Sequence, residues 1–527
     1  MLFNSYIFWL FFGVVLLLYR RLPHRGQNVM LLVASYIFYG AWDWRFLSLI
    51  LISTLVDYVA AIQIGKRKDA RARKVLLGIS CCANLGILGF FKYFNFFAQE
   101  LTHLLSAIGL EFMAPTLDIV LPVGISFYTF QTMSYTIDVY RGRTQPLRDP
   151  LDFALYVAFF PQLVAGPIER STDLVPQIVN PRTVRASDFS EGLWLILWGL
   201  FKKVVIADNM AIIVNGLFAE NPRALSGPEC WIAVYAFALQ IYGDFSGYSA
   251  IARGVARWMG FHLSPNFLFP YFSATPSEFW TRWHISLSSW LRDYLYIPLG
   301  GNRGGMLITC RNLLLTMVLG GLWHGAAWGF VVWGLVHGLL LVGYRLTARR
   351  SIVAQVSNLL YRRFPIGRLF DRGVADSARS GLETRDTADW KSALHRRQAS
   401  GCEISGPGMQ AGATLGVWRL PLALLFFHLV CVAWLFFRAE DVGQALVMLG
   451  RMFTDFQGST LALFGISSIL FFGLPILLLE FWLFVRNDDL LPARKHWAMR
   501  GMVYAYLAFM LMTFAPAENY EFIYFQF

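Results

Sequence analysis

The sequence predicts an all-α polytopic membrane protein with about ten to twelve transmembrane helices, plus re-entrant and interfacial helices. Of its 527 residues, 56% are hydrophobic and only 15% are charged, so ordinary soluble cores cannot bury the apolar surface. Apolar runs of about 20 residues recur along the chain, the length at which a helix crosses a bilayer. Basic residues gather between these runs, as expected for loops retained in the cytoplasm.

The composition also excludes two other classes of protein. The net charge of +12 does not indicate nucleic-acid binding, because the basic residues flank apolar runs instead of forming a separate patch. Of the six cysteines, two are adjacent and four are scattered; none has metal-ligand spacing, so neither a metal site nor a disulfide framework is predicted.

Four predicted spans open the chain. The basic residues at 20–25 and 66–74 follow the first and third spans, which places both loops in the cytoplasm and the amino terminus in the periplasm. The first run has no basic region before it and no small-residue cleavage site after it. It is therefore predicted to be retained as a span and not removed as a signal peptide. The four spans are residues 2–18, 28–42, 46–64 and 75–97.

Polar residues interrupt the apolar runs in the middle of the chain. Lys203 and Asp244 lie inside apolar runs, so either these helices surround a hydrated funnel or their boundaries are misplaced. Asp244 is expected to form a structural ion pair, with Lys203 or an arginine of residues 275–297 as its partner. Prolines break residues 151–168, which favours a re-entrant segment. The predicted runs are 119–140, 151–168, 191–218 and 231–259.

Three regions are predicted along the chain. Residues 1–344 form a membrane-embedded core, and residues 345–415 form a cytoplasmic basic loop that is partly disordered. Arginine pairs alternate with aspartates in this loop, and long apolar runs are few. Residues 416–527 form the C-terminal transmembrane helices, with spans at 420–437, 466–485 and 502–514.

The rest of the chain is organised around residues 275–344. Thr275, Pro276 and Glu278 form a helix start signal: an N-cap, a proline at the first helical position, and a glutamate that reaches back to the cap. Aromatic residues then recur at helical spacing, which predicts an interfacial helix at about 275–297. After a glycine-rich turn, an almost uncharged catalytic helix is predicted at about 312–344.

His324 lies near the middle of that second predicted helix. It follows Arg311 by roughly 20 Å of helix at 1.5 Å per residue, which places it near the bilayer midplane. Ionisable groups at that depth are costly and by default mark a site or a water-filled path. The alternative is a histidine that only forms a hydrogen bond to a neighbouring helix. Gly321 and Gly325 beside it suit helix packing or the close approach of a substrate.

Several motifs resemble one known family. The longest are residues 279–296 (FWTRWHISLSSWLRDYLY), 300–303 (GGNR) and 320–326 (GGLWHGA). They closely resemble the membrane-bound O-acyltransferase family and, within it, the bacterial branch that modifies polysaccharides. Residues 121–128, 165–167, 242–248 and 522–527 also look like that branch, so the resemblance covers most of the chain.

The resemblance implies a membrane core with a funnel that leads to a buried histidine, and acyl transfer from a thioester to a hydroxyl group. Such a transfer needs a base, and imidazole titrates near neutrality. His324 is assigned as this catalytic base. His284 is the second catalytic position; it either orients the acceptor, stabilises the oxyanion or shares the proton, or only supports its helix. Further expected substrate or funnel residues are Trp283, Trp323, Gly321, Gly325, Arg292, Asp293, Asn302, Asp244 and Gln131.

The donor and the partners are also implied by the resemblance. Acetyl-CoA is expected as a cytoplasmic donor, with no permanently bound cofactor, for a multi-pass protein in the bacterial inner membrane. The expected acceptor is a secreted exopolysaccharide, alginate first, with cellulose or another glycan as alternatives. Members of this branch work with periplasmic acetyltransferases that have a Ser-His-Asp triad (SGNH type), so the immediate acceptor is either a partner serine or the glycan. Other exopolysaccharide-assembly subunits are further expected partners.

Two other functions stay open at this point. One is a lipid or teichoic-acid acyltransferase of the same family, which would share His324. The other is a non-catalytic acyl-group transporter or scaffold. A transporter should show repeated halves with broken helices, which the sequence lacks. A scaffold predicts that His324→Ala leaves polymer acetylation intact.

Overall fold

The computed structural model describes residues 1–111, 113–348, 419–516, 520 and 522–523. In these residues the chain is all-helical, without any strand, which confirms the all-α class, while the count of ten to twelve transmembrane helices stays a prediction. The chain divides into a larger unit, residues 1–342 and 419–527, and a smaller unit, residues 343–418. Apart from residues 345–348, the predicted cytoplasmic loop at 345–415 lies outside the described residues.

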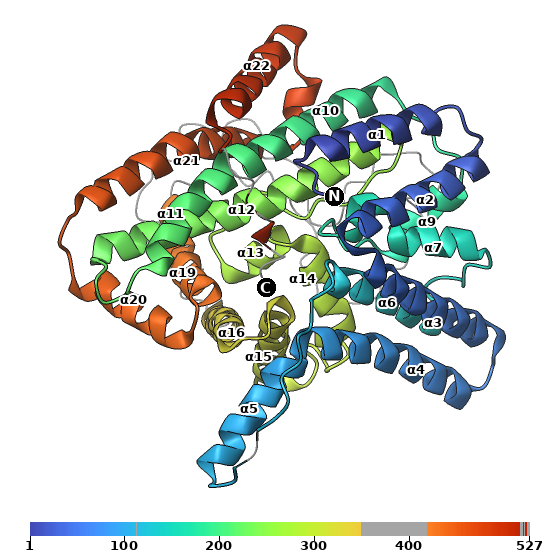
Figure 1. The fold of residues 1–527 in the computed structure, drawn as a ribbon, viewed down its shortest axis with the longest axis horizontal. Coiled ribbons are helices and arrows are strands. Elements are labelled where there is room, and N and C mark those ends of the chain that lie inside the picture. Colours follow the sequence, from blue (N-terminus) through green and yellow to red (C-terminus); the bar gives the residue numbers. More distant parts are fainter. Residues whose placement is uncertain (112, 349–418, 517–519, 521, 524–527) are drawn as a thin grey trace, which may run out of the picture. The chain divides into compact units, whose positions relative to one another are not determined.

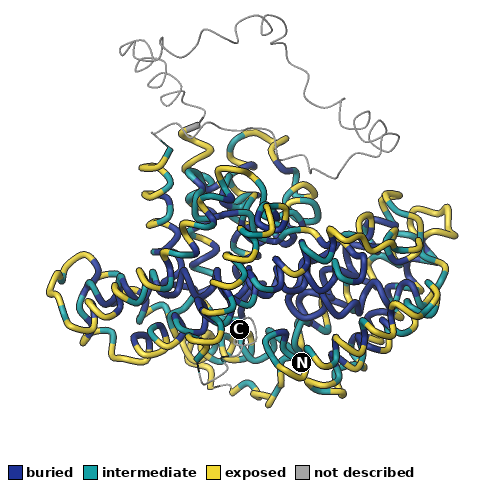
Figure 2. Tube along the Cα trace, turned by 90° about the horizontal axis from the view of Figure 1, so that it is seen from above, coloured by how far each residue is buried: buried dark blue, intermediate teal, exposed yellow. Residues whose placement is uncertain are grey.

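Six described stretches are long and apolar enough to cross a membrane, which fits a multi-pass membrane protein. The first two contain more than one helix. Buried residues fill the interior of the larger unit and exposed residues lie along its edges (Figure 2). Large apolar side chains stay exposed there, such as Leu10 and Leu463 at 74% and 70%, as suits contact with lipid. The six stretches are His24–Lys66, Ala70–Ala107, Gly305–His324, Trp328–Thr347, Arg419–Arg438 and Thr460–Arg486.

The N-terminal helices follow the predicted spans closely. Ser5 caps α1 by accepting a hydrogen bond from the backbone N–H of Phe8, and Asp69 caps α4 in the same way. One turn of π-helix, η2, interrupts the fourth predicted span. The elements are α1 (Tyr6–Tyr19), α2 (His24–Asp43), η1 (Trp44–Phe46), α3 (Leu47–Lys66), α4 (Ala70–Leu88), η2 (Gly89–Tyr93) and α5 (Phe94–Ala107).

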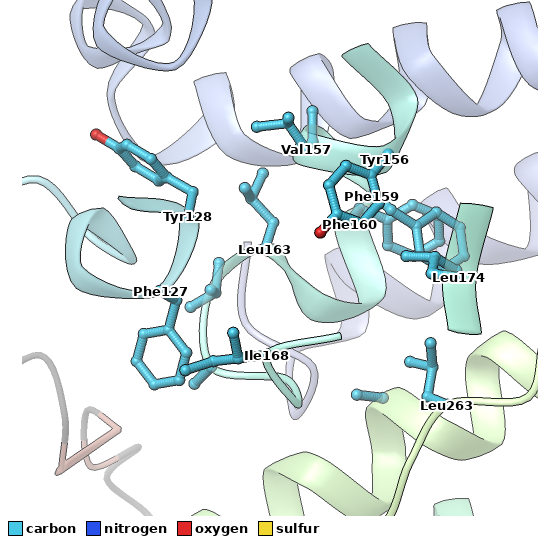
Figure 3. Close-up of a cluster of buried hydrophobic side chains, with 14 of the residues drawn as sticks. Phe127, Tyr128, Tyr156, Val157, Phe159, Phe160, Leu163, Ile168, Leu174 and Leu263 are labelled. Atoms are coloured by element: carbon cyan, nitrogen blue, oxygen red, sulfur yellow. The ribbon is translucent and has the colours of Figure 1, made fainter. Parts of the chain in front are cut away.

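The segment predicted to be re-entrant is indeed broken. It contains two short helices, α7 (Pro150–Ala158) and α8 (Phe160–Leu163), followed by α9 (Ser171–Val179). Both short helices are almost completely buried against α6 (Ile125–Tyr140) and α2. Figure 3 shows their side chains gathered with those of α6 in one apolar cluster. Non-helical backbone is tolerated in a membrane protein when other parts of the protein bury it in this way.

A long buried helix, α12 (Gly227–Trp258), forms the centre of the larger unit. It runs beside α10 (Ala186–Leu200) and α11 (Asp208–Ala219) (Figure 1). Close backbone approach is possible because glycines face each other: a Cβ on Gly199 would lie 2.6 Å from the carbonyl oxygen of Gly247. A π-helix, η3 (Phe201–Ala207), joins α10 to α11, so the predicted run at 191–218 is helical throughout.

The remaining elements include those that carry the histidines. Four C-terminal helices pack beside α12 and η3; one of them, α20, was not predicted. The elements are η4 (Pro270–Phe272), α13 (Pro276–Arg282), α14 (Ile285–Leu291), η5 (Arg292–Tyr296), α15 (Gly305–His324), α16 (Trp328–Ala348), α19 (Arg419–Arg438), α20 (Val442–Thr454), α21 (Thr460–Arg486), η7 (Leu491–Arg494) and α22 (Trp497–Phe514).

Candidate active site

The interfacial helix predicted at about 275–297 is broken at His284. Thr275 caps α13 as expected, although Glu278 accepts from the backbone of Ala274 and not from the cap residue. Trp283 has extended backbone, and His284 has left-handed backbone, with φ 42° and ψ 55°. That conformation is unfavourable for a residue with a Cβ. The prediction of one continuous helix was therefore wrong, and the break gives the His284 side chain its direction.

Asn266 holds the start of α14 directly after this break. Its side-chain oxygen accepts hydrogen bonds from the backbone N–H and the hydroxyl of Ser286, at 3.2 and 2.7 Å. Its backbone oxygen accepts from the N–H of Ile285 at 2.9 Å. The side-chain amide donates in turn to Ser249 on α12. Asn266 is 1% exposed, and it fixes the backbone on the C-terminal side of His284.

The second predicted helix, 312–344, is also broken. Helix α15 ends at His324, Gly325 is extended, and α16 begins at Trp328. A Cβ on Gly334 would lie 2.3 Å from the carbonyl oxygen of Met317, so the two helices run back along each other as a hairpin. His324 therefore ends α15 near the tip of this hairpin. The helix from Arg311 to His324 is unbroken, so the position of His324 near the bilayer midplane stays a prediction.

The glycines near His324 serve packing of the protein against itself. A Cβ on Gly321 would lie 2.2 Å from the carbonyl oxygen of Phe330, and a Cβ on Gly325 would lie 2.0 Å from the ring of Phe330. Because the protein's own chain occupies the space beside these glycines, they allow the two arms of the hairpin to approach closely.

The two breaks bring His284 and His324 together. Their ring centroids lie 6.3 Å apart, and the two residues are 0% and 4% exposed. The indole of Trp323 contacts both imidazoles, with centroid distances of 5.9 and 5.1 Å. Phe245 packs edge-on against His284, and Phe437 packs edge-on against His324. The walls of the site are thus aromatic, which excludes water and strengthens every polar interaction inside.

A lysine that sequence reasoning missed binds the end of α15. The amine of Lys92 donates to the carbonyl oxygens of Trp323 and His324, at 2.9 and 2.8 Å. The neighbouring hydroxyl of Tyr93 donates to the carbonyl oxygen of Leu322 at 2.9 Å. A single lysine inside the apolar run at 75–97 was the available signal.

A third histidine, also missed, lies beside the pair. His337 on α16 is 0% exposed and contacts Trp333 with ring centroids 4.8 Å apart. His324 contacts the same Trp333 at 5.1 Å. Trp280 packs edge-on against His337 from α13. Neither ring nitrogen of His337 has a hydrogen-bond partner among the described residues. A histidine in the apolar helix after His324 was the signal in the sequence.

Two predicted funnel residues bind other parts of the protein. The side-chain amide of Gln131 donates to the carbonyl oxygen of Tyr156 at 2.7 Å, which ties α6 to α7. Asp244 forms the expected ion pair with Lys203, at 2.7 Å, and accepts from the backbone N–H of Ile523 at 2.6 Å. Both contacts are structural, and a role for either residue in a funnel stays a prediction.

Four more predicted residues differ in their burial and in their contacts. Trp283 is 1% exposed and packs on the aromatic side chains of α13 and α19. Arg292 and Asp293 bind each other at 2.8 Å on η5, and the arginine side chain is 63% exposed. Asn302 is exposed. The glycine-rich turn is held instead by Asn312, whose side chain donates to the carbonyl oxygens of residues 299 and 301.

Comparison with known proteins defines the class. Residues 144–375 match the model of the membrane-bound O-acyltransferase family. The chain is 47% identical to the probable alginate O-acetylase AlgI of Pseudomonas putida, over 65% of this chain and 70% of that protein. It is 37% identical to the peptidoglycan O-acetyltransferase of Helicobacter pylori, over 66% and 70%. It is 29% identical to the teichoic acid D-alanyltransferase of Bacillus subtilis, over 42% and 58%.

An all-helical, multi-pass membrane protein with these relatives is an O-acyltransferase. The chain belongs to the membrane-bound O-acyltransferase family, as the resemblance of its motifs predicted. The matched residues 144–375 contain both His284 and His324.

Proposed function

We propose that this protein moves an acetyl group from a cytoplasmic thioester across the inner membrane for O-acetylation of a secreted exopolysaccharide, with alginate as the first candidate. The observation that carries this proposal is the meeting of His284 and His324 in an aromatic, water-excluding site, with centroids 6.3 Å apart. The names of the relatives that are 46% and 47% identical over 65% and 70% of their length support alginate as the polymer.

The chemistry assigned to the pair is direct acyl transfer. His324 accepts the proton of the acceptor hydroxyl as its oxygen attacks the thioester carbonyl carbon. The carbonyl oxygen becomes an oxyanion, which a ring N–H of His284 stabilises. Collapse of this intermediate breaks the carbon–sulfur bond, and the leaving thiolate takes the proton from His324. The products are an oxygen ester and a free thiol, and no covalent enzyme intermediate is needed.

The donor in this proposal is acetyl-CoA, bound from the cytoplasmic side. The basic residues that follow the span at 119–140 favour a cytoplasmic position for the end of α6. Arg141 from this end and Arg170 both lie over the ring of Tyr294 on η5, with centroid distances of 5.3 and 4.5 Å. Together with the exposed Arg292, they supply positive charge for the phosphates of a nucleotide thioester.

The acceptor in this proposal lies on the periplasmic side. A periplasmic acetyltransferase with a Ser-His-Asp triad would receive the acetyl group on its serine and pass it to the polymer. Only the acetyl group would then cross the membrane, while the thioester donor stays in the cytoplasm.

Acetyl ester content of the secreted polymer tests the proposal. We expect cells that carry His324→Ala, or no copy, to secrete a normal amount of polymer with at least tenfold less ester, with the variant at normal membrane levels. If the polymer from His324→Ala cells keeps its acetyl esters, the assignment of His324 as the base is wrong and a transporter or scaffold is favoured. A second assay supplies radiolabelled acetyl-CoA and measures label in the polymer. If added palmitoyl-CoA lowers this label and added free CoA does not, the protein is a lipid acyltransferase.

A second candidate acceptor is peptidoglycan. The relative from Helicobacter pylori is 37% identical over 70% of its length, so the same chemistry could serve a cell-wall glycan. Measuring acetyl esters in purified peptidoglycan from the same three strains separates the two acceptors. Loss of ester from peptidoglycan alone would favour this second candidate over a secreted polymer.

A further inference from the structure

The end of α15 is bound by a pair of residues from a distant part of the chain. Lys92 and Tyr93 are consecutive, yet together they donate three hydrogen bonds to three consecutive carbonyl oxygens, those of residues 322, 323 and 324. All three distances are 2.8 or 2.9 Å. The last of these carbonyls belongs to His324 itself.

Helix geometry explains why these carbonyls need a partner. The last four carbonyls of an α-helix have no N–H partner within the helix, and the helix dipole places partial negative charge on them. A helix usually ends in a turn that satisfies these groups with following N–H groups. Here Gly325 is extended, with φ −160° and ψ 153°, so the chain leaves α15 without such a turn. The amine of Lys92 and the hydroxyl of Tyr93, both on η2, satisfy these carbonyls instead.

The position of Lys92 is costly for a structural cap. Its amine is partly buried and lies 5.9 Å from the ring centroid of Trp323. Within the described residues it forms no salt bridge with a carboxylate. It also lies in a turn of π-helix, a feature that frequently marks functional sites. A glycine turn would satisfy these carbonyls with backbone N–H groups and without burying an amine.

We propose that Lys92 is a positioning residue for acyl transfer, and that with Tyr93 it fixes the peptide of His324 so that the imidazole faces His284. This inference rests on the proposed function, because it needs His324 to take the proton. Lys92 itself does not touch the reacting groups in this proposal. It acts through the end of α15, where a shift of about 1 Å in the imidazole can cost roughly a hundredfold in rate.

Permeabilised cells that lack their own copy and express full-length variants provide the test. Radiolabelled acetyl-CoA is supplied at several concentrations, and label in the precipitated polymer gives the rate and the KM for the donor. The variants are Lys92→Met, Lys92→Arg and Tyr93→Phe. Lys74→Met is the matched control, because Lys74 is an exposed lysine of α4, the helix that leads directly into η2. Membrane levels and melting temperatures in detergent are measured for each.

We expect Lys92→Met to lower the maximal rate about 30- to 100-fold with KM changed less than threefold, and Tyr93→Phe to lower it about three- to tenfold, as loss of positioning predicts. Lys92→Arg keeps the charge and the donors and should recover at least a third of the wild-type rate. A Lys92→Met rate within threefold of wild type, or a change confined to KM, would overturn the inference. If Lys92→Met fails to accumulate, equal rates for Tyr93→Phe and wild type would overturn it.

His324→Ala in the same assay separates this inference from the proposed function. An inactive His324→Ala with a fully active Lys92→Met would contradict the positioning role alone. An active His324→Ala would contradict the proposed function first.

Discussion

The side-chain oxygen of Asn266 accepts two hydrogen bonds from Ser286, one from the backbone N–H at 3.2 Å and one from the hydroxyl at 2.7 Å. Ser286 is the second residue of α14, and His284 immediately precedes that helix in a left-handed conformation. The amide therefore holds a strained backbone at the point where a buried histidine turns into the site.

Asn266→Ala should lower both stability and activity. It removes the acceptor for two buried donors, which costs about 1–3 kcal/mol, and it frees the backbone that directs His284. We expect a lower melting temperature in detergent and at least tenfold less polymer acetylation at equal membrane levels. Asn266→Asp keeps the acceptor oxygen and should retain more of both. Equal melting temperatures and ester contents for Asn266→Ala and wild type would contradict this role.

Substitutions of His284 should separate its chemistry from its backbone strain. Asparagine adopts left-handed backbone more readily than most residues, so His284→Asn should fold as well as wild type and keep a side-chain donor. His284→Ala keeps the strain and loses the donor. If the donor stabilises the oxyanion, His284→Ala should lose about 100-fold in acetyl transfer, and His284→Asn clearly less. If both variants have normal melting temperatures and lose acetyl transfer to the same extent, a side-chain amide cannot replace the hydrogen-bond donor of His284.

The hairpin of α15 and α16 predicts a severe effect of Gly325→Ala. The added Cβ would lie 2.0 Å from the ring of Phe330, and overpacking of this kind costs about 1–3 kcal/mol or more. Gly86→Ala on α4 is the control, since nothing lies within 4 Å of its Cβ position; it should leave stability unchanged or slightly raised. Melting temperatures of the two variants in the same detergent provide the comparison. Adding Phe330→Ala to Gly325→Ala should recover part of the loss.

The sequence predicted most helices but not the breaks within residues 275–344. Apolar length locates spans such as α3 and α21 reliably, because the bilayer sets that length. Aromatic periodicity continues straight through Trp283 and His284, so nothing local indicates a change of direction there. The break depends on Asn266, which lies outside the aromatic repeat, 20 residues before Ser286, and binds the backbone at the start of α14. Tertiary hydrogen bonds of this kind override local helical preference.

The candidate site was predicted in part for the same reason. His284 and His324 could be found because they lie in recognisable motifs, and the structure brings them together. Lys92 and His337 lie in apolar runs without a motif, and their importance depends on contacts with α15 and Trp333. A charged or titratable residue inside an apolar run is the general signal for such positions.

Glu169 should make the stability of the protein depend on pH. Its carboxylate is 1% exposed and accepts from the backbone N–H of Ser264, and burial raises its pKa to about 7. Because the folded pKa is above the unfolded value, the stabilising contribution is complete below about pH 4.5 and is lost as the pH rises through about 7. The loss is on the order of 3 kcal/mol for a shift of this size.

Melting temperatures in detergent at pH 5 and pH 8 test this prediction with wild type and Glu169→Gln. The glutamine oxygen can accept from the Ser264 N–H, and its amide can donate to the Ser264 hydroxyl, as a protonated acid could. We therefore expect the wild-type melting temperature to fall between the two values of pH, and the variant to show a clearly smaller fall. Parallel curves for the two proteins would assign the dependence on pH to other groups.

His337 should affect activity more than it affects stability. Its two ring nitrogens lack partners within the described residues, and a buried polar group without a partner costs about 1–3 kcal/mol. His337→Phe replaces it with an apolar ring of similar shape in a box formed by Phe279, Trp280 and Trp333. The melting temperature should therefore stay equal or rise.

A stabilising change at this position would mean that the histidine is kept for another reason, since natural proteins tolerate unfavourable polar groups mainly at functional sites. His337 and His324 contact the same Trp333, so we expect His337→Phe to lower acetyl transfer at least tenfold despite its stability. His428→Phe is the matched control, because His428 lies on α19 with its ring nitrogen bound to the carbonyl oxygen of Leu424. A fully active His337→Phe would confine the chemistry to His284 and His324.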